Sequence, residues 1–294
     1  MDMLTQNFKE VEIRNGVSVR HRARNLALDA LALKQRFVDG RDAIYRPRVQ
    51  FLFFHHVFQD ELENFELLVR ELAEVHTFIS HTEAVDRLLS GNVDRPYISW
   101  SSDDGFLNNL QAAEILERYG AKACFFLNPS SIGMTDHQKI TAFCDRRLNM
   151  PPIAFLDWRG VEALLKNGHE IGAHTVHHQR VTEMSLSQFG EDLELCKEQL
   201  EEKCGPVHHF AYPYGRYFDF YRAAHELVFQ KGYSSCSSGE RGCHVSNGER
   251  IKKEALFIRR DQVIAAWKRE HMKFFIVSNA AKAVYEDNFL PPSL

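Results

Sequence analysis

Short apolar runs alternate with longer amphipathic stretches from Val49 onward, which is typical of strand and helix units around a mostly parallel sheet. The runs are rich in aromatic and β-branched residues. They predict strands at Val49 to Phe54, Val75 to Ile79, Tyr97 to Ser101, Ala123 to Leu127, Glu170 to Ala173, His208 to Ala211, Tyr233 to Cys236 and Lys273 to Val277. Because no Pro- or Ser-rich linker interrupts the series, we expect an α/β fold that closes, or nearly closes, into one (β/α)7-8 barrel.

The clearest of the intervening helices runs from Ser185 to Lys203. Ser185 and Gln188 have the spacing of a capping box, and Gly205 follows as a terminator. The apolar face between these ends consists of Phe189, Leu193, Cys196 and Leu200. This spacing of three and four residues predicts an amphipathic helix packed on the sheet.

Residues 1–48 follow a different pattern, and we expect them to form an extension packed on a barrel of residues 49–294. The alternation from Phe8 to Arg20, with Asn15-Gly16 at its centre, predicts a β-hairpin. A helix is predicted from Asn25 to Phe37.

Charge and composition exclude several kinds of partner. The 36 basic and 40 acidic side chains give a net charge of −4, and no block of like charges marks a nucleic-acid or anionic-membrane surface. No apolar run is long enough to span a membrane, and the first residues lack the basic and then apolar pattern of a secretory signal. We therefore expect a cytoplasmic protein without a transmembrane segment or a nucleic-acid partner. The six cysteines form no C-x-x-C pair, so free thiols are expected.

Three polar motifs directly follow predicted strands, where a (β/α) barrel carries its chemistry. The first is Ser101-Ser102-Asp103-Asp104-Gly105. Neighbouring side chains at a strand end point in different directions, so one carboxylate can bind a metal ion while the other faces a water on that ion. The alternative is an ordinary helix N-cap, in which the carboxylates satisfy free N–H groups of the next helix.

The second motif is the histidine cluster His174-Thr175-Val176-His177-His178. His174 and His178 are four residues apart, which on a turn or short helix puts two imidazoles on one side, as zinc sites require. His177 adjoins His178 and is therefore expected to be exposed or to support the site without binding the same ion.

The third motif is the aromatic loop Phe210-Ala211-Tyr212-Pro213-Tyr214-Gly215. Such a loop can direct one backbone N–H toward a reacting oxygen and line a groove for a sugar ring. Taken alone, it is equally well a plain turn with its aromatic side chains in the core. The occurrence of three such motifs at strand ends favours a catalytic site.

Together these motifs resemble the polysaccharide deacetylase family, carbohydrate esterase family 4. Asp-Asp-Gly, His-Thr-x-x-His and Tyr-Pro-Tyr-Gly stand in the order found in that family, and His169 to Ala173 and Ala121 to Phe126 are also similar. Phe53-Phe54-His55-His56-Val57 resembles the start of a permuted branch, in which a histidine motif has moved to the N-terminal side. The resemblance spans about residues 49–265.

The resemblance implies a distorted barrel of the polysaccharide deacetylase type and a metal-dependent hydrolase that removes an N-acetyl group from an amino sugar. Its partner would be an N-acetylated sugar or glycan. Asp104, His174 and His178 would bind a divalent metal ion, most often Zn²⁺, and Asp103 would be the general base.

Further roles follow from the same resemblance. His55 matches the permuted histidine and is the expected general acid, although it could be an ordinary histidine at a strand end. Tyr214 would supply the backbone N–H of the oxyanion site, and Tyr212, Pro213 and Tyr214 would contact the sugar. Arg260 lies where the family often has an arginine near the base, and could otherwise be a solvated surface charge.

Two departures from the family pattern bear on activity. Ser101-Ser102 replaces the usual threonine and phenylalanine before the aspartates, and Ala211 stands where many relatives have the arginine that orients the base. That orientation must come from elsewhere, and Arg260 is the available residue.

Other function classes stay open. A carbohydrate-binding protein that has lost catalysis on the same fold is compatible with Ser102 and Ala211, and an N-formyl sugar is a possible substrate in place of an N-acetyl sugar. A metal-dependent phosphate-ester hydrolase is disfavoured because no basic cluster is visible to bind phosphate. The expected cytoplasmic location favours a nucleotide-linked or lipid-linked precursor of a surface polysaccharide as substrate.

Overall fold

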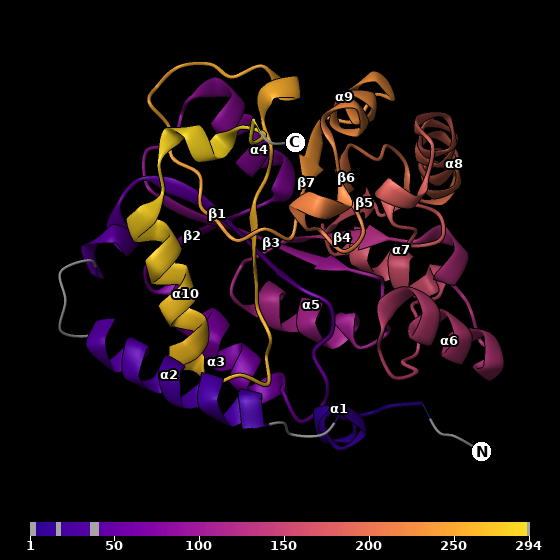
Figure 1. Cartoon of the computed structure of the whole chain (residues 1–294), viewed down its shortest axis with the longest axis horizontal. Helices are drawn as coiled ribbons and strands as arrows, with labels where there is room; N and C mark the ends of the chain where they lie inside the picture. The colour runs from indigo at the N-terminus through magenta and orange to yellow at the C-terminus, as the bar shows by residue number, and fades with distance from the viewer. Residues whose placement is uncertain (1–3, 16–18, 36–40, 293–294) are drawn as a thin grey trace.

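The computed structural model of the chain describes residues 4–15, 19–35 and 41–292, and a barrel of parallel strands forms its centre (Figure 1). The strands are β1 (Arg48–Phe54), β2 (Thr77–Ile79), β3 (Pro96–Asp103), β4 (Ala123–Leu127), β5 (Glu170–Ala173), β6 (His209–Ala211), β7 (Ser235–Ser237) and β8 (Arg260–Gln262). They follow the order β7-β6-β5-β4-β3-β1-β8, and β2 also pairs with β3. The prediction of an α/β barrel of seven to eight strands is confirmed.

The sheet nearly closes between β7 and the segment that leads into β8. The Ile258 N–H donates to the Cys236 carbonyl at 3.1 Å, and the Ser238 N–H donates to the Ile258 carbonyl at 2.8 Å. Because the strands are parallel, their carboxyl ends meet at one rim of the barrel. The three polar motifs of the sequence therefore come together at this rim.

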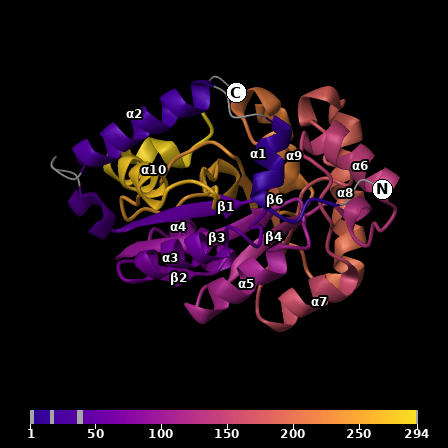
Figure 2. The same cartoon turned by 90° about the horizontal axis from the view of Figure 1, so that it is seen from below.

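Helices cover the outside of the barrel (Figures 1 and 2). They are α1 (Phe8–Asn15), α2 (Val19–Gln35), α3 (Leu62–Ala73), α4 (His81–Ser90), α5 (Asn109–Arg118), α6 (His137–Phe143), α7 (Trp158–Lys166), α8 (Leu186–Cys204), α9 (Arg222–Gln230) and α10 (Arg269–Lys282). The apolar faces of α3, α5, α7, α8 and α9 join the strands in one large core. Helix α8 begins at Ser185 with the predicted capping box and ends at Gly205.

Seven of the predicted strands occur at or within two residues of the expected positions. The eighth prediction is wrong: Lys273 to Val277 lies inside helix α10. The buried residues Met272, Ile276 and Ala280 recur every four positions on that helix, which is the helical period and not the alternation of a strand. The strand that completes the barrel is β8, which the sequence prediction missed because this three-residue strand is Arg-Asp-Gln, without an apolar run.

The predicted hairpin from Phe8 to Arg20 is also wrong. Phe8–Asn15 is helix α1, and Arg20 belongs to α2, while Gly16 lies outside the described residues. The Phe8 N–H donates to the Asp60 carboxylate at 2.8 Å, so a residue far along the chain satisfies the free N–H groups of α1. The predicted helix from Asn25 onward is confirmed as part of α2, and its end at Phe37 lies outside the described residues.

All six cysteines are free thiols, as the sequence predicts. Among the described residues, none of the helices has both the length and the apolar character that crossing a bilayer requires.

Candidate active site

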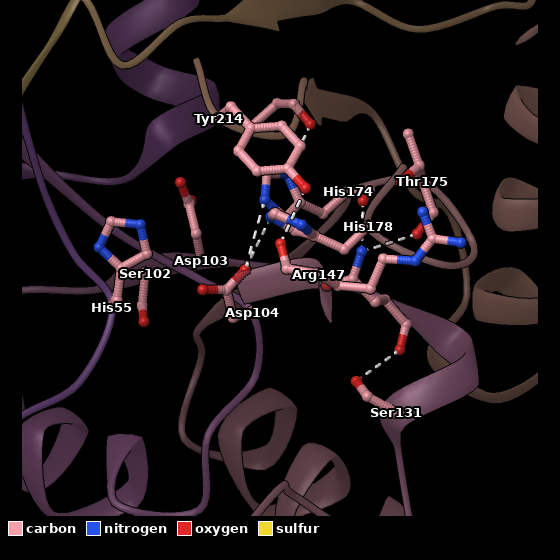
Figure 3. Close-up of polar contacts among 12 residues, drawn as sticks. His55, Ser102, Asp103, Asp104, Ser131, Arg147, His174, Thr175, His178 and Tyr214 are labelled. Atoms are coloured by element: carbon pink, nitrogen blue, oxygen red, sulfur yellow. Dashed lines mark hydrogen bonds and ion pairs between the residues drawn. The ribbon is translucent and has the colours of Figure 1, made fainter. Parts of the chain in front are cut away.

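Loops at the carboxyl ends of β3, β5 and β6 bring the three sequence motifs into one cavity (Figure 3). Asp103 is the last residue of β3, and Asp104 follows it in the left-handed backbone region with φ of 73°. Gly105 continues the turn with φ of 71°, a conformation that glycine adopts without steric cost. His174 comes directly after β5, and His178 ends the next turn.

Asp104, His174 and His178 form a compact set of three side chains that could hold a metal ion, and we call them the metal-binding set. The His178 Nε2 lies 3.3 Å from Asp104 Oδ1, and the His174 Nε2 lies 3.6 Å from the same oxygen. One ligand atom from each of the three residues lies within 4.8 Å of the other two. His174 Nδ1 is 2.7 Å from the Ala211 carbonyl, to which it donates, and this leaves the Nε2 lone pair facing the set.

The electrostatics of these residues fit a divalent cation. Burial, followed by the negative charge of Asp103, raises the pKa of Asp104 well above its usual value. Burial also lowers the pKa of His178 well below its usual value, with His174 adding to the effect, so the imidazole is neutral and its lone pair is free. Asp104 Oδ1 is buried without a hydrogen-bond donor in the described part of the chain. An Asp/His/His set with an unsatisfied oxygen is a donor set that metal ions such as Zn²⁺ bind.

Asp103 is held by Arg260 from strand β8. The guanidinium donates from Nη1 to Oδ1 at 2.7 Å and from Nη2 to Oδ2 at 2.8 Å. It also donates to the Ser101 hydroxyl at 3.2 Å and, from Nε, to the Ser238 carbonyl at 2.8 Å. Burial alone would raise the pKa of Asp103, but the positive charges of Arg260 and then His174 outweigh burial and lower it. Asp103 is therefore a carboxylate at neutral pH, with its plane fixed.

His55 follows strand β1 and lines the same cavity as Asp103. Its Nδ1 lies 3.2 Å from the side-chain amide nitrogen of Gln262. Burial lowers the pKa of His55 to about 4, although the charge of Asp103 acts in the opposite direction. The ring is thus neutral before substrate binds, and Gln262 fixes its orientation.

The aromatic loop places its two tyrosines in different environments. Tyr212 is fully buried, stacks on Phe220 with ring centroids 4.2 Å apart and donates to the Gly215 carbonyl at 3.1 Å. Pro213 is buried as well. The side chain of Tyr214 is 38% exposed, so it is the one of the three predicted sugar contacts that presents its side chain to solvent.

Tyr214 covers one of the metal-binding histidines (Figure 3). Its ring packs on His178 at 4.9 Å, and its hydroxyl donates to the Arg147 carbonyl at 2.9 Å. Its backbone has φ of 65°, and within the described residues its N–H donates no hydrogen bond. A backbone N–H without an acceptor, on a residue whose ring packs on His178, is available to stabilise an oxyanion.

The sequence analysis missed two residues that support the histidine turn. The Asn128 side chain donates to the Thr175 carbonyl at 2.9 Å and also to the His174 carbonyl. Asp192 of α8 accepts from the Val176 N–H at 3.2 Å. Asn128 directly follows β4, so the strand-end position that drew attention to the other motifs was a signal for this residue too. Asp192 had no such signal, because it lies inside a helix.

The structure also places His177 and Ser102, whose roles the sequence analysis left open. His177 is exposed, as predicted, and its ring is not part of the metal-binding set. The hydroxyl of Ser102, where the family has a larger side chain, accepts from the Asn109 side chain at 2.8 Å. Ser102 thus fixes the start of α5 below the carboxylates and leaves both of them in place.

The cavity above these residues has a volume of about 590 Å³. Besides the residues already described, its walls include Phe8 and Val11 of α1, Arg24 of α2, and Trp267 after β8. This size is within the range of sites that enclose small ligands.

Comparisons with known proteins agree with this architecture. Residues 90–232 match the family model described as polysaccharide deacetylase. The deacetylase PplD of Streptococcus pyogenes, solved in complex with acetate, has a TM-score of 0.61 and 15% identity over 84% of this chain and 100% of that chain. IcaB from Ammonifex degensii has a TM-score of 0.59 and 18% identity over 78% of this chain and 97% of that chain.

A de-N-acetylase from Aggregatibacter actinomycetemcomitans has a TM-score of 0.56 and 14% identity over 78% of this chain and 99% of that chain. At these identities the three likenesses show a shared fold. No curated protein matches the sequence.

Proposed function

We propose that the chain is a metal-dependent hydrolase of the polysaccharide deacetylase family, whose model matches residues 90–232, and that it removes the N-acetyl group from an amino sugar of a polysaccharide or its precursor. The observation that carries this proposal is the convergence of Asp104, His174 and His178 on one point. Next to them in the chain, Asp103 forms an ion pair with Arg260. A glycan-binding protein without activity would have no need for a carboxylate held in this way.

The proposed metal is Zn²⁺, and Asp104, His174 and His178 would hold it. When bound, such an ion polarises an amide carbonyl and lowers the pKa of a water molecule so that hydroxide is available near neutral pH. Three protein ligands leave coordination positions open, which distinguishes a catalytic zinc site from a structural one.

The remaining groups have roles in moving protons and stabilising charge. We assign Asp103 as the general base that accepts a proton from the attacking water, because its carboxylate is ionised and fixed by Arg260. We assign His55 as the donor of a proton to the departing amine, which is a poor leaving group until it is protonated. Because the resting ring is neutral, His55 would have to take up a proton before this step. The Tyr214 N–H would donate to the oxyanion that develops on the former carbonyl oxygen, an interaction typically worth about 3 to 4 kcal/mol.

Several finer points are part of the same proposal. His55 precedes the Asp-Asp motif in the chain, which supports placement in the permuted branch of the family. Residues 1–48 would be an extension on a barrel of residues 49–294. The cytoplasmic location and a precursor of a surface polysaccharide as substrate stay predictions from the sequence.

The direct test measures acetate release and metal content together. The purified chain loaded with Zn²⁺ should release acetate from N-acetylglucosamine oligosaccharides. Asp104→Asn should lose bound metal and activity, whereas Asp103→Asn should keep the metal and lose activity. Loss of metal in Asp103→Asn would reassign that residue as a ligand. A zinc-loaded, folded chain that binds the oligosaccharides and releases no acetate would favour the carbohydrate-binding alternative.

A further inference from the structure

The N-terminal helices form part of the wall of the active-site cavity. Phe8, Val11 and Glu12 of α1 and Arg24 and Asn25 of α2 line the same cavity as the metal-binding set. Figures 1 and 2 show α2 alongside α10. Residues from the first helices of the chain therefore face the predicted catalytic groups at the carboxyl ends of the strands.

Helix α1 is fixed to the barrel by polar and apolar contacts. The Thr5 N–H donates to the Pro152 carbonyl at 2.8 Å, and the Phe8 N–H donates to Asp60 at the same distance. Val11 is 5% exposed and belongs to an apolar cluster with Phe58. The other buried members of that cluster are Phe106, Ile140, Cys144, Ile153 and Phe155. These contacts hold α1 against the barrel as one wall of the cavity.

Helix α2 is fixed to the segment after β8. Asp29 accepts from Lys268 and lies 2.8 Å from the His271 Nε2. The guanidinium of Arg24 lies 4.4 Å from the ring centroid of Trp267, at the cavity. This cation–π contact joins α2 to the segment between β8 and α10, and both of its residues line the cavity.

The reacting groups lie deep inside these walls. The side chains of Asp104, His174 and His178 are only 4%, 3% and 6% exposed. A polymer that binds through an internal sugar must continue in both directions, and therefore needs a groove that is open at two ends. A single sugar or the last sugar of a chain needs only one opening.

On the basis of the proposed function, we infer that α1 and α2 restrict the substrate to a terminal or single N-acetylated amino sugar and exclude the internal sugars of a polymer. The specificity is steric: α1 and the Arg24–Trp267 contact occupy space through which the second arm of a polymer would run. The inference concerns which sugar unit reacts, and leaves the chemistry at the metal-binding set unchanged.

The test is the position of deacetylation in N-acetylglucosamine tetramers and hexamers. The zinc-loaded chain should deacetylate only an end unit, identified by mass spectrometry of fragmented products. Phe8→Ala combined with Val11→Ala removes the apolar contacts of α1 and should raise the yield of internally deacetylated product by about tenfold or more, equivalent to about 1.4 kcal/mol. Ile13→Ala, on the 82% exposed residue of the same helix, is the matched control and should keep the native pattern.

A second variant keeps the inference testable if the Phe8→Ala and Val11→Ala double variant does not fold. Arg24→Ala removes an exposed side chain from the lining and should also admit internal sugars. Internal deacetylation by the native chain would overturn the inference and leave the proposed deacetylase function intact. An unchanged product pattern in both folded variants would overturn it as well. The absence of acetate from every oligomer would instead refute the proposed function, and the inference with it.

Discussion

The guanidinium of Arg260 and the carboxylate of Asp103 meet in a two-point ion pair, with N–O distances of 2.7 Å and 2.8 Å. The two residues come from β8 and β3, which are separated in the sheet by β1. Arg260 is 1% exposed and also lies over the ring of Phe53 at 4.4 Å. The pair is therefore fixed from several sides, and Arg260 can fill the orienting role for which Ala211 has no side chain.

We expect Arg260→Lys to lower kcat on an N-acetylated sugar by about 10- to 100-fold, because lysine keeps the charge and loses the planar two-point contact that orients the base. Zinc content measured on the same preparation should not change, since the metal-binding set is untouched. Arg259→Lys is the neighbouring control, as Arg259 pairs with Asp287 away from Asp103. Equal activity of both variants would show that the orientation of Asp103 does not limit the reaction.

His55 should matter only where the leaving group needs a proton. We expect His55→Ala to lower the rate of amide hydrolysis by about 100-fold or more, in line with general acid catalysis. Hydrolysis of p-nitrophenyl acetate should be affected much less, because its phenolate leaves without protonation. The comparison of the two substrates, with metal content unchanged, is the measurement.

The adjacent histidine provides the control for this experiment. His56 Nδ1 lies 3.4 Å from Glu61, and His56→Gln should keep most of the amide activity. If His55→Ala lowers amide and ester hydrolysis by the same factor, His55 is not the proton donor, and a role in shaping the cavity would be the better assignment.

Asp192 should control how tightly the histidine turn binds metal. Its carboxylate accepts from the Val176 N–H, between Thr175 with φ of 60° and His178 with φ of 50°. Two left-handed residues in one short turn need such support, so we expect Asp192→Ala to weaken zinc binding by about 10- to 100-fold, as is typical when a residue behind a ligand is lost. Competition with a chromophoric chelator measures this, and Glu198→Ala on the exposed face of α8 is the matched control. Unchanged affinity would mean that Asn128 alone holds the turn.

Buried histidines make the fold sensitive to acid. Burial lowers the pKa to about 4 in His76, His225 and His244 and to about 3 in His209. In the unfolded chain these groups titrate near 6.5, so between about 4 and 6.5 the unfolded state binds more protons. Their contribution to stability is complete above pH 6.5 and is lost as the pH falls, by about 1.4 kcal/mol per pH unit for each group.

Two carboxylates act in the opposite direction. Burial raises the pKa of Asp192 and Asp261 to about 6, so these groups favour the folded state as the pH falls from 6 toward 4. Four histidines outweigh two aspartates, and we expect the free energy of unfolding in urea to fall between pH 6.5 and 4.5. His225→Gln should reduce this slope, and His208→Gln, at an exposed position, should not. A flat profile for the native chain would contradict the assignment.

The barrel was predictable because its strands carry apolar runs, and the metal-binding set was predictable because its residues follow those strands. The errors have physical causes. Strand β8 is held by Arg260 and Asp261, whose buried polar contacts leave no hydrophobic pattern to detect. Helix α1 depends on Asp60 for its N-terminal cap. Phe8 and Asp60 are 52 residues apart in the sequence, so no local pattern predicts this contact. For the same reason, no local pattern predicts that α1 lines the active-site cavity.

The glycine that ends the aromatic loop offers a test of how closely that loop must pack. Gly215 has φ of 72°, and a Cβ there would lie 2.5 Å from the Gly239 N, a contact between backbones that cannot yield without moving the loop. We expect Gly215→Ala to lower the free energy of unfolding by about 1 to 3 kcal/mol and to reduce kcat by shifting the Tyr214 N–H.

Gly120 serves as a control that separates the cost of the left-handed backbone from the cost of the close contact with Gly239. It has nearly the same backbone angle, with φ of 73°, and a Cβ there would have no atom within 4 Å. Gly120→Ala should therefore show only the cost of the left-handed conformation, about 1 kcal/mol, and normal kcat. Urea unfolding and acetate release on both variants are the measurements. If Gly215→Ala loses no more than Gly120→Ala in either, the close approach to Gly239 does not position the loop, and the oxyanion role of Tyr214 would lose its structural support.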